Sequence, residues 1–124
     1  MKVRIMQLTE HFNSDEFACH CGCGYDDIDM NLVAKLEELR DNVGEPLIIN
    51  SGCRCPEHNA EVGGVSNSQH VYGKAADVEL PDGYTVDEFA DIAEEIGFDG
   101  IGKYDWGIHV DVRGYTARWD FREE

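Results

Sequence analysis

The sequence has few basic residues. Lys and Arg total 10 against 26 Asp and Glu, so the net charge is −16. Phosphate backbones and anionic membrane surfaces attract clustered cations, which this chain lacks. We therefore expect no nucleic-acid partner and no binding to acidic membranes.

Long apolar stretches are also missing. No run approaches the roughly 20 residues of a membrane-spanning helix, so membrane insertion is not expected. The start, Met1–Gln7, is followed at once by polar residues and is too short an apolar stretch for a signal peptide. We expect synthesis in the cytoplasm without a signal peptide.

Repeats, low-complexity tracts and linker-like breaks are likewise absent. With 124 residues, 42% of them hydrophobic, the chain is long enough to bury one core and too apolar for disorder. The sequence predicts a single domain over 1–124.

Local signals predict an α+β fold. Asp29 can cap a helix that Gly44 ends, and Thr85 with Glu88 forms a capping box for another helix that Gly97 ends. Helices followed by closely spaced strands indicate a small, mainly antiparallel sheet with helices packed on it. The expected helices are 30–42, 56–62 and 85–96, and the expected strands are 47–49, 74–80, 100–104, 107–113 and 115–119, with a turn at Gly114.

Two histidines and one aspartate are the candidate metal ligands. His70 precedes a glycine turn, Asp77 follows on an expected strand, and His109 lies on a later strand. Two imidazoles and a carboxylate suit zinc, and three protein ligands leave a fourth position open, as in catalytic sites. The competing interpretation is that these are ordinary surface polar residues.

The strands around these residues add to the argument. Asp77 lies in an apolar strand, where a buried carboxylate is unfavourable unless a cation or metal meets it. His109, Asp111 and Arg113 alternate along one strand and must share a face. That face either borders a hydrated functional site or is an ordinary solvent-exposed surface of the sheet.

Taken in order, these motifs resemble the zinc D-Ala-D-Ala carboxypeptidase family, which includes small phage and bacterial peptidoglycan peptidases such as the L-alanyl-D-glutamate endolysins. The resemblance runs over nearly the whole chain, including Ser51–Arg54, Asn67–Asp77 and His109–Arg113. It implies a D-Ala-D-Ala peptidase or Hedgehog-like fold.

The resemblance also implies roles for single residues. His70, Asp77 and His109 would be the zinc ligands. Arg54 would bind substrate and help to neutralise the oxyanion, and Ser68 would hydrogen-bond the peptide.

The general base departs from the family pattern. Relatives place a carboxylate or histidine three positions before the last histidine ligand, where this chain has Trp106. Asp105, one residue earlier, is our preferred catalytic base. Asp111 is the alternative, and it could instead orient His109.

Five cysteines form a triplet and a pair. They are Cys19, Cys21, Cys23, Cys53 and Cys55. A second, structural zinc ion that draws on both groups is one interpretation, although the Cys-x-Cys-x-Cys spacing is tighter than a usual zinc knuckle. Free thiols and a later disulfide are the alternatives, and His20 and His58 are further candidate donors.

The expected function is zinc-dependent hydrolysis of an amide bond in peptidoglycan stem peptides, of the DD-carboxypeptidase or L-Ala-D-Glu endopeptidase type. We expect a monomer that acts at the cell wall after release, in lysis or remodelling, as a phage endolysin would. The alternative is a non-catalytic cell-wall or protein-binding module on the same fold. A signalling domain related to the Hedgehog group rests on fold analogy alone.

Overall fold

The computed structural model describes residues 7–21, 23, 25, 28–64 and 68–122. Asn67 of the family motif and all but the last residue of Met1–Gln7 lie outside these residues. The elements, in order, are η1 (Ser14–Phe17), α1 (Met30–Val43), β1 (Ile49–Ser51), α2 (Pro56–Glu61), β2 (Ala75–Glu79), α3 (Val86–Ile96), β3 (Gly100–Tyr104), β4 (Gly107–Asp111) and β5 (Ala117–Asp120).

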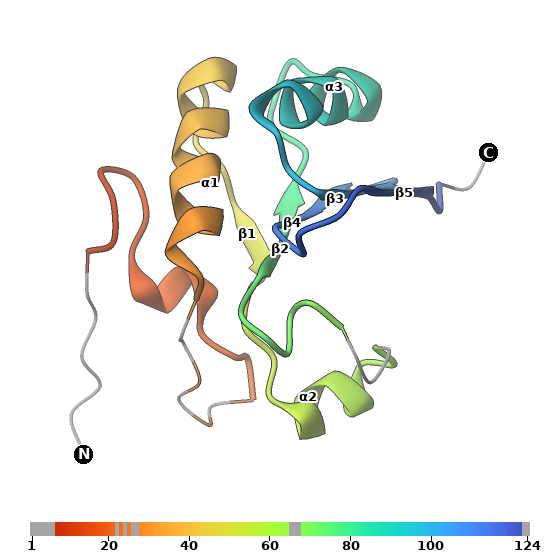
Figure 1. Ribbon diagram of the computed structural model, residues 1–124. Coiled ribbons are helices and arrows are strands. Elements are labelled where there is room, and N and C mark those ends of the chain that lie inside the picture. The colour runs from red at the N-terminus through yellow and green to blue at the C-terminus, as the bar shows by residue number, and fades with distance from the viewer. Residues whose placement is uncertain (1–6, 22, 24, 26–27, 65–67, 123–124) are drawn as a thin grey trace.

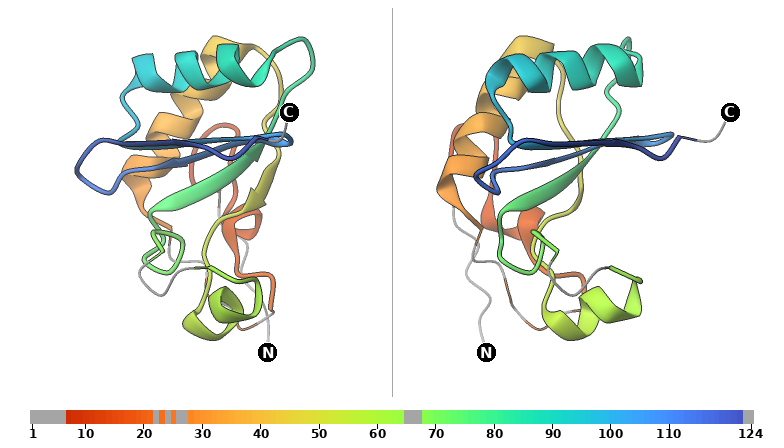
Figure 2. Two further views of the ribbon diagram at one scale, coloured as in Figure 1. Left: turned by 90° about the vertical axis from the view of Figure 1, so that its right-hand side faces the viewer. Right: turned by 45° about the vertical axis from the view of Figure 1, so that its right-hand side comes forward.

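The strands form one sheet in the order β1-β2-β4-β3-β5. α3 lies over one face of the sheet beside α1, and α2 lies on the opposite side (Figures 1 and 2). β1, β2, β4 and β3 pair antiparallel in turn, whereas β5 pairs parallel to β3. The α+β class is therefore confirmed, but the sheet is mixed rather than mainly antiparallel.

The parallel pair has a simple cause. β4 is already paired on both edges, with β2 and β3. The chain that leaves β4 therefore passes β3 and pairs, as β5, with the outer edge of that strand. Asp99, just before β3, holds this crossing: its side chain accepts a hydrogen bond from Gly114 N (2.9 Å) and its carbonyl accepts one from Ala117 N (3.0 Å). The turn expected at Gly114 therefore lies in a crossover, where Gly114 has a φ of 97°.

The helix ends follow the predicted signals. The Asp29 side chain accepts a hydrogen bond from Asn31 N at the start of α1, and Gly44 ends that helix with a left-handed φ of 74°. Thr85 and Glu88 form the capping box of α3. No helix in the described part of the chain is both long and apolar enough to cross a membrane.

The core lies between the two long helices and the sheet. α1 buries the predicted Leu32, Val33, Leu36 and Leu39. In α3 the buried face is turned toward Ala90, and Ile92 and Ile96 are only half-buried at its margin. The central strands β2 and β4 thus turn Ala76, Val78, Ile108 and Val110 into this core, while Asp77 and His109 lie on the other face of the sheet.

The first strand begins later than predicted. β1 spans Ile49–Ser51 instead of 47–49, and Ile48 is 56% exposed. As an edge strand, β1 buries its side chains less than the central strands do. Its register with β2 brings Ser51 opposite Asp77, so that the next residues of the chain reach the polar face.

Candidate metal centre

The sheet register brings the predicted ligands together. Asp77 on β2 lies directly opposite His109 on β4, and neighbouring residues in such a pair point to the same face. His70 lies in the turn before β2, which Gly73 closes with a φ of 70°. Because Arg54 N and Gly73 N both donate to the His70 carbonyl, the turn is anchored from two sides.

The donor atoms of these three residues are closely spaced. His70 Nε2 and His109 Nδ1 each lie 3.2 Å from Asp77 Oδ1. A tetrahedral zinc ion with bonds of about 2.0–2.1 Å separates neighbouring ligand atoms by roughly 3.3 Å. The spacing and the chemistry of His70, Asp77 and His109 therefore fit a zinc ion.

The outer nitrogen of each imidazole has its own hydrogen-bond partner. His70 Nδ1 lies 2.7 Å from the Gly52 carbonyl, to which it can only donate. His109 Nε2 lies 2.7 Å from Asp111 Oδ2. With protons on these outer nitrogens, the inner nitrogens of both rings can bind a metal ion, as those of ligand histidines do. In the absence of an ion the inner nitrogens can instead carry a proton and donate to Asp77.

The Asp111 carboxylate also has a hydrogen-bond partner on its own strand's continuation, Arg113. Its side chain is fully buried, and Arg113 donates to it from Nε (3.0 Å) and from Nη2 (2.7 Å). Gly100 on β3 makes room for the carboxylate, which a Cβ at that position would overlap. The Asp111 carboxylate thus lies behind His109 and bridges its ring to Arg113.

These contacts also shift the ionisation of the site. Burial acts to raise the pKa of Asp77, but hydrogen bonds with His109 and His70 outweigh it and leave the pKa well below its usual value. Asp111 follows the same pattern through His109 and Arg113. Burial acts to lower the pKa of His109, and its bonds to both carboxylates raise it above the usual 6.5. Both carboxyl groups are therefore ionised near neutral pH.

Arg54 lies at the edge of this centre. Its Nη2 donates to Asp77 Oδ2 (3.2 Å), Nη1 donates to Asn59 Oδ1 (3.3 Å) and Nε donates to Ser51 Oγ (3.1 Å). The guanidinium is thus held in place while remaining part of the cavity wall. Ser68 also lines the cavity, and its Oγ accepts a hydrogen bond from His70 N (3.3 Å).

A cavity of about 370 Å³ opens over the three candidate ligands. Its wall contains aromatic side chains that the sequence analysis did not identify: Tyr104, Tyr115, Trp119 and Phe121. The Trp119 and His109 rings lie 4.9 Å apart, and Trp119 Nε1 donates to the Tyr104 hydroxyl (2.8 Å). The signal in the sequence is the alternation of Arg113, Tyr115, Ala117, Trp119 and Phe121, which points every second side chain to one face.

Asp105 is not brought to the cavity. It lies exposed in the turn between β3 and β4, and it is not among the described residues that line the cavity. Its neighbour Trp106 stacks on Tyr104 with ring centroids 5.0 Å apart. The structure therefore separates the preferred catalytic base from the candidate ligands.

Four of the five cysteines form a cluster, and the fifth, Cys53, lies apart from it. Cys19, Cys21, Cys23 and Cys55 have sulfur atoms that all lie within 4.8 Å of one another, and no disulfide joins any of the five. Cys53 is not part of this cluster. Cys53 is 1% exposed and packs in the apolar core, and its backbone N donates to the Phe17 carbonyl (2.8 Å).

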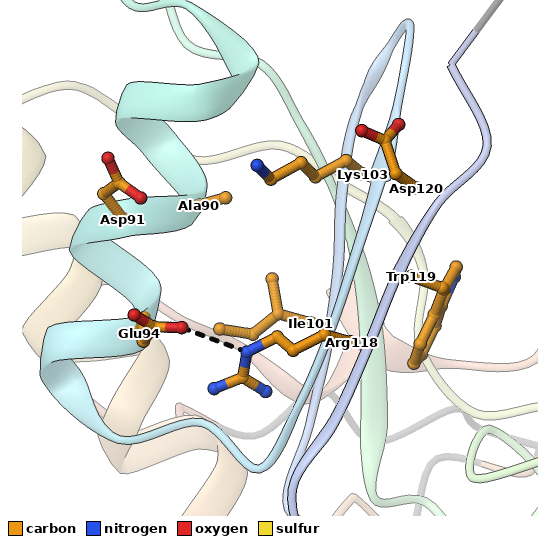
Figure 3. Close-up of a pocket in the computed structure, with 8 residues that line it drawn as sticks. All are labelled: Ala90, Asp91, Glu94, Ile101, Lys103, Arg118, Trp119 and Asp120. Carbon is orange, nitrogen blue, oxygen red and sulfur yellow. Dashed lines mark hydrogen bonds and ion pairs between the residues drawn. The ribbon is translucent and has the colours of Figure 1, made fainter.

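A second cavity of about 370 Å³ lies on the helical face, between α3 and the strands β3 and β5 (Figure 3). Arg118 pairs there with Glu94 (3.1 Å), and Lys103 pairs with Asp87 at its margin (2.8 Å). Among the described residues this cavity contains no group of clustered metal ligands.

Comparison with known proteins agrees with this geometry. The zinc D-Ala-D-Ala carboxypeptidase of Streptomyces albus G is 47% identical to this chain over 45 residues, which are 36% of this chain and 18% of that protein. The match thus spans less than a fifth of the relative. The family described as Peptidase M15 matches residues 10–112, which confirms the resemblance seen in the sequence. This chain belongs to the Peptidase M15 family.

Proposed function

We propose that this chain is a zinc-dependent peptidase that hydrolyses an amide bond in peptidoglycan stem peptides. The observation that carries the proposal is the convergence of His70 Nε2 and His109 Nδ1 on Asp77 Oδ1, each at 3.2 Å, on the floor of a cavity. The name of the Streptomyces albus G relative adds support for zinc and for this substrate class.

His70, Asp77 and His109 would hold the metal, and the cavity above them leaves room for a substrate. When bound, zinc would act as a Lewis acid toward a peptide carbonyl and toward water. Gly52 and Asp111 keep the two imidazoles in the tautomers that bind metal.

The cavity favours a substrate with a carboxylate. In a chain with a net charge of −16, Arg54 and Arg113 nevertheless line this cavity. An arginine fork matches a carboxylate or a developing oxyanion with parallel hydrogen bonds. Stem peptides carry a carboxylate beside both bonds under consideration, D-Ala-D-Ala and L-Ala-D-Glu. We extend the proposal to action at the cell wall, in lysis or remodelling, as in an endolysin.

A non-catalytic binding module on the same fold is the second candidate. It is favoured by one observation: among the described residues that line the cavity, Asp77 is the one carboxylate, and it is a candidate ligand. A proton acceptor separate from the ligands is thus not evident in the cavity wall.

Mass spectrometry of defined stem peptides, after incubation with the zinc-loaded chain, tests the proposal. We expect cleavage that stops on chelation and returns with zinc, and the products identify the bond. Asp77→Asn should lose zinc and cleavage, whereas Asp91→Asn, the same change in the other cavity, should keep both.

Cleavage that survives thorough removal of the metal would refute the metal-dependent reaction. Stoichiometric zinc with peptide binding but no turnover, on several stem peptides, would establish the binding module instead.

A further inference from the structure

Four cysteine sulfur atoms come together outside the site described above. Cys19, Cys21 and Cys23 follow η1, and Cys55 caps the start of α2, more than thirty residues later. Cys19 Sγ lies 3.4 Å from Cys21 Sγ and 3.9 Å from Cys55 Sγ, and Cys21 Sγ lies 3.5 Å from Cys55 Sγ.

These distances distinguish a metal cluster from a disulfide. A disulfide joins its sulfur atoms at about 2.0 Å. Zinc–sulfur bonds of about 2.3 Å place the corners of a tetrahedron roughly 3.8 Å apart. The separations of 3.4, 3.5 and 3.9 Å lie around the tetrahedral value. We propose that Cys19, Cys21, Cys23 and Cys55 bind a second zinc ion.

The backbone around the cluster suits negatively charged sulfur. Cys55 N donates to Cys19 Sγ (3.4 Å), and His58 N donates to Cys55 Sγ (3.4 Å). Four thiolates fill a tetrahedral ion completely, so neither His20 nor His58 is needed as a ligand. No position is left for water, and the ion is structural.

The ion would link two segments that are distant in sequence, at the edge of the proposed peptidase site. The loop that carries Cys55 also carries Gly52, whose carbonyl accepts from His70 Nδ1, and Arg54, which donates to Asp77. This loop also packs against Phe17, whose backbone lies so close to Gly52 that a Cβ on Gly52 would clash with it. The second ion therefore holds this loop against the segment that follows η1. This assignment goes beyond the proposed function and does not depend on it.

Metal analysis and cobalt substitution of the intact chain test the assignment. We expect one more zinc ion per wild-type chain than per Cys21→Ser or Cys23→Ser chain. Cobalt in the wild type should give intense thiolate-to-metal charge-transfer absorption, which both serine variants lose. Cys53→Ala is the matched control, because it also removes one cysteine but keeps both ions and the absorption.

His70→Ala separates this inference from the proposed function. That variant should lose the ion of the peptidase site and keep the charge-transfer absorption. A wild-type chain without peptidase activity but with the absorption would refute the peptidase alone. The structural ion is refuted if Cys21→Ser binds as much zinc as the wild type, or if wild-type cobalt protein shows no thiolate absorption. A disulfide among these cysteines in protein purified with zinc and without oxidant would also refute it.

Discussion

The buried hydrogen bond between His109 and Asp111 gives a prediction for a single residue. Asp111→Asn removes the charge that orients the imidazole and leaves Arg113 without its carboxylate. Loss of such a partner behind a metal ligand weakens metal affinity by roughly 10–100-fold. We expect a loss of this size in the zinc affinity, measured by competition with a chromophoric chelator.

Asp105→Asn is the matched comparison, because it makes the same change four positions before His109. Since Asp105 lies exposed in the β3–β4 turn, we expect zinc affinity and turnover close to wild type. If this variant binds zinc normally but loses turnover, Asp105 is the catalytic base after all. Equal zinc affinity in both variants would contradict the role of Asp111.

The candidate ligands could be predicted because their residue types and their order along the chain match the family pattern, which implies that His109 joins His70 and Asp77 although it lies far from them in sequence. The alternation after Arg113 marks Tyr115, Trp119 and Phe121 as one face, but it does not predict the pairing of β5 with β3, which brings this face to the cavity. The burial of Cys53 in the core, apart from the other cysteines, likewise involves residues that are distant in sequence. Candidate site residues could be identified from their chemistry, whereas the pairing of segments that are distant in sequence could not be predicted.

Glu37 gives a prediction for pH dependence away from the metal centre. Its two carboxylate oxygens each lie 2.6 Å from a nitrogen of His11, one backbone and one imidazole. Burial acts to raise the pKa of Glu37, but these bonds lower it below the usual 4.5. A lowered pKa contributes stability above pH 4.5, which is lost as the pH falls through the folded-state value.

We expect Glu37→Gln to lower the free energy of unfolding at pH 7 by about 1–2 kcal/mol. The difference from wild type should shrink as the pH falls below 4.5 and through the lowered pKa of Glu37. Urea titrations at a series of pH values measure it, with the exposed Glu38→Gln as control. A difference that grows in acid would contradict the assigned role.

The close packing of β3 and β5 gives a prediction for the sheet. A Cβ at Gly102 would overlap the Trp119 indole, which lies across β3 toward His109. Gly102→Ala should therefore cost about 1–3 kcal/mol, as other overpacking changes do. Thermal unfolding measures the loss, and tryptophan fluorescence reports the displaced ring.

A double variant tests whether the clash with Trp119 causes the loss of stability in Gly102→Ala. Trp119→Leu removes the atoms that the new methyl group would meet, so Gly102→Ala should cost much less in that background. Equal costs in the two backgrounds would place the strain elsewhere.

Secondary structure was predictable to the extent that short-range signals determine it. The capping residues Asp29 and Thr85 and the glycines Gly44 and Gly97 mark helix ends through contacts within a few residues. The partner of the last strand depends instead on which sheet edge remains open after β4 is paired on both sides. No local pattern encodes that information, so the prediction of a mainly antiparallel sheet was wrong for the last strand.

The charge of the whole molecule predicts how salt acts on stability. With a net charge of −16, the folded chain repels itself, and salt shortens the range of that repulsion from about 10 Å at 0.1 M to about 3 Å at 1 M. We expect Tm to rise with sodium chloride, by roughly 4 °C for each kcal/mol gained.

Neutralising exposed carboxylates should reduce that salt effect. A triple variant, Glu45→Gln, Asp82→Asn and Glu95→Gln, changes three exposed side chains and should show a higher Tm in low salt and a shallower rise. A Tm that falls with salt in the wild type would show that ion pairs outweigh the repulsion.

The strand order has a consequence for how copies of this molecule meet in crowded solution. A bare, flat outer strand invites a neighbouring chain to extend the ladder, which is the first step of aggregation. β5 is the outer strand on one side, and it alternates Arg118 and Asp120 with Trp119. On the other side, the chain just after β1 bonds to Phe17 of η1. Charge at one border and a covering segment at the other thus disfavour fibril-like growth of the sheet.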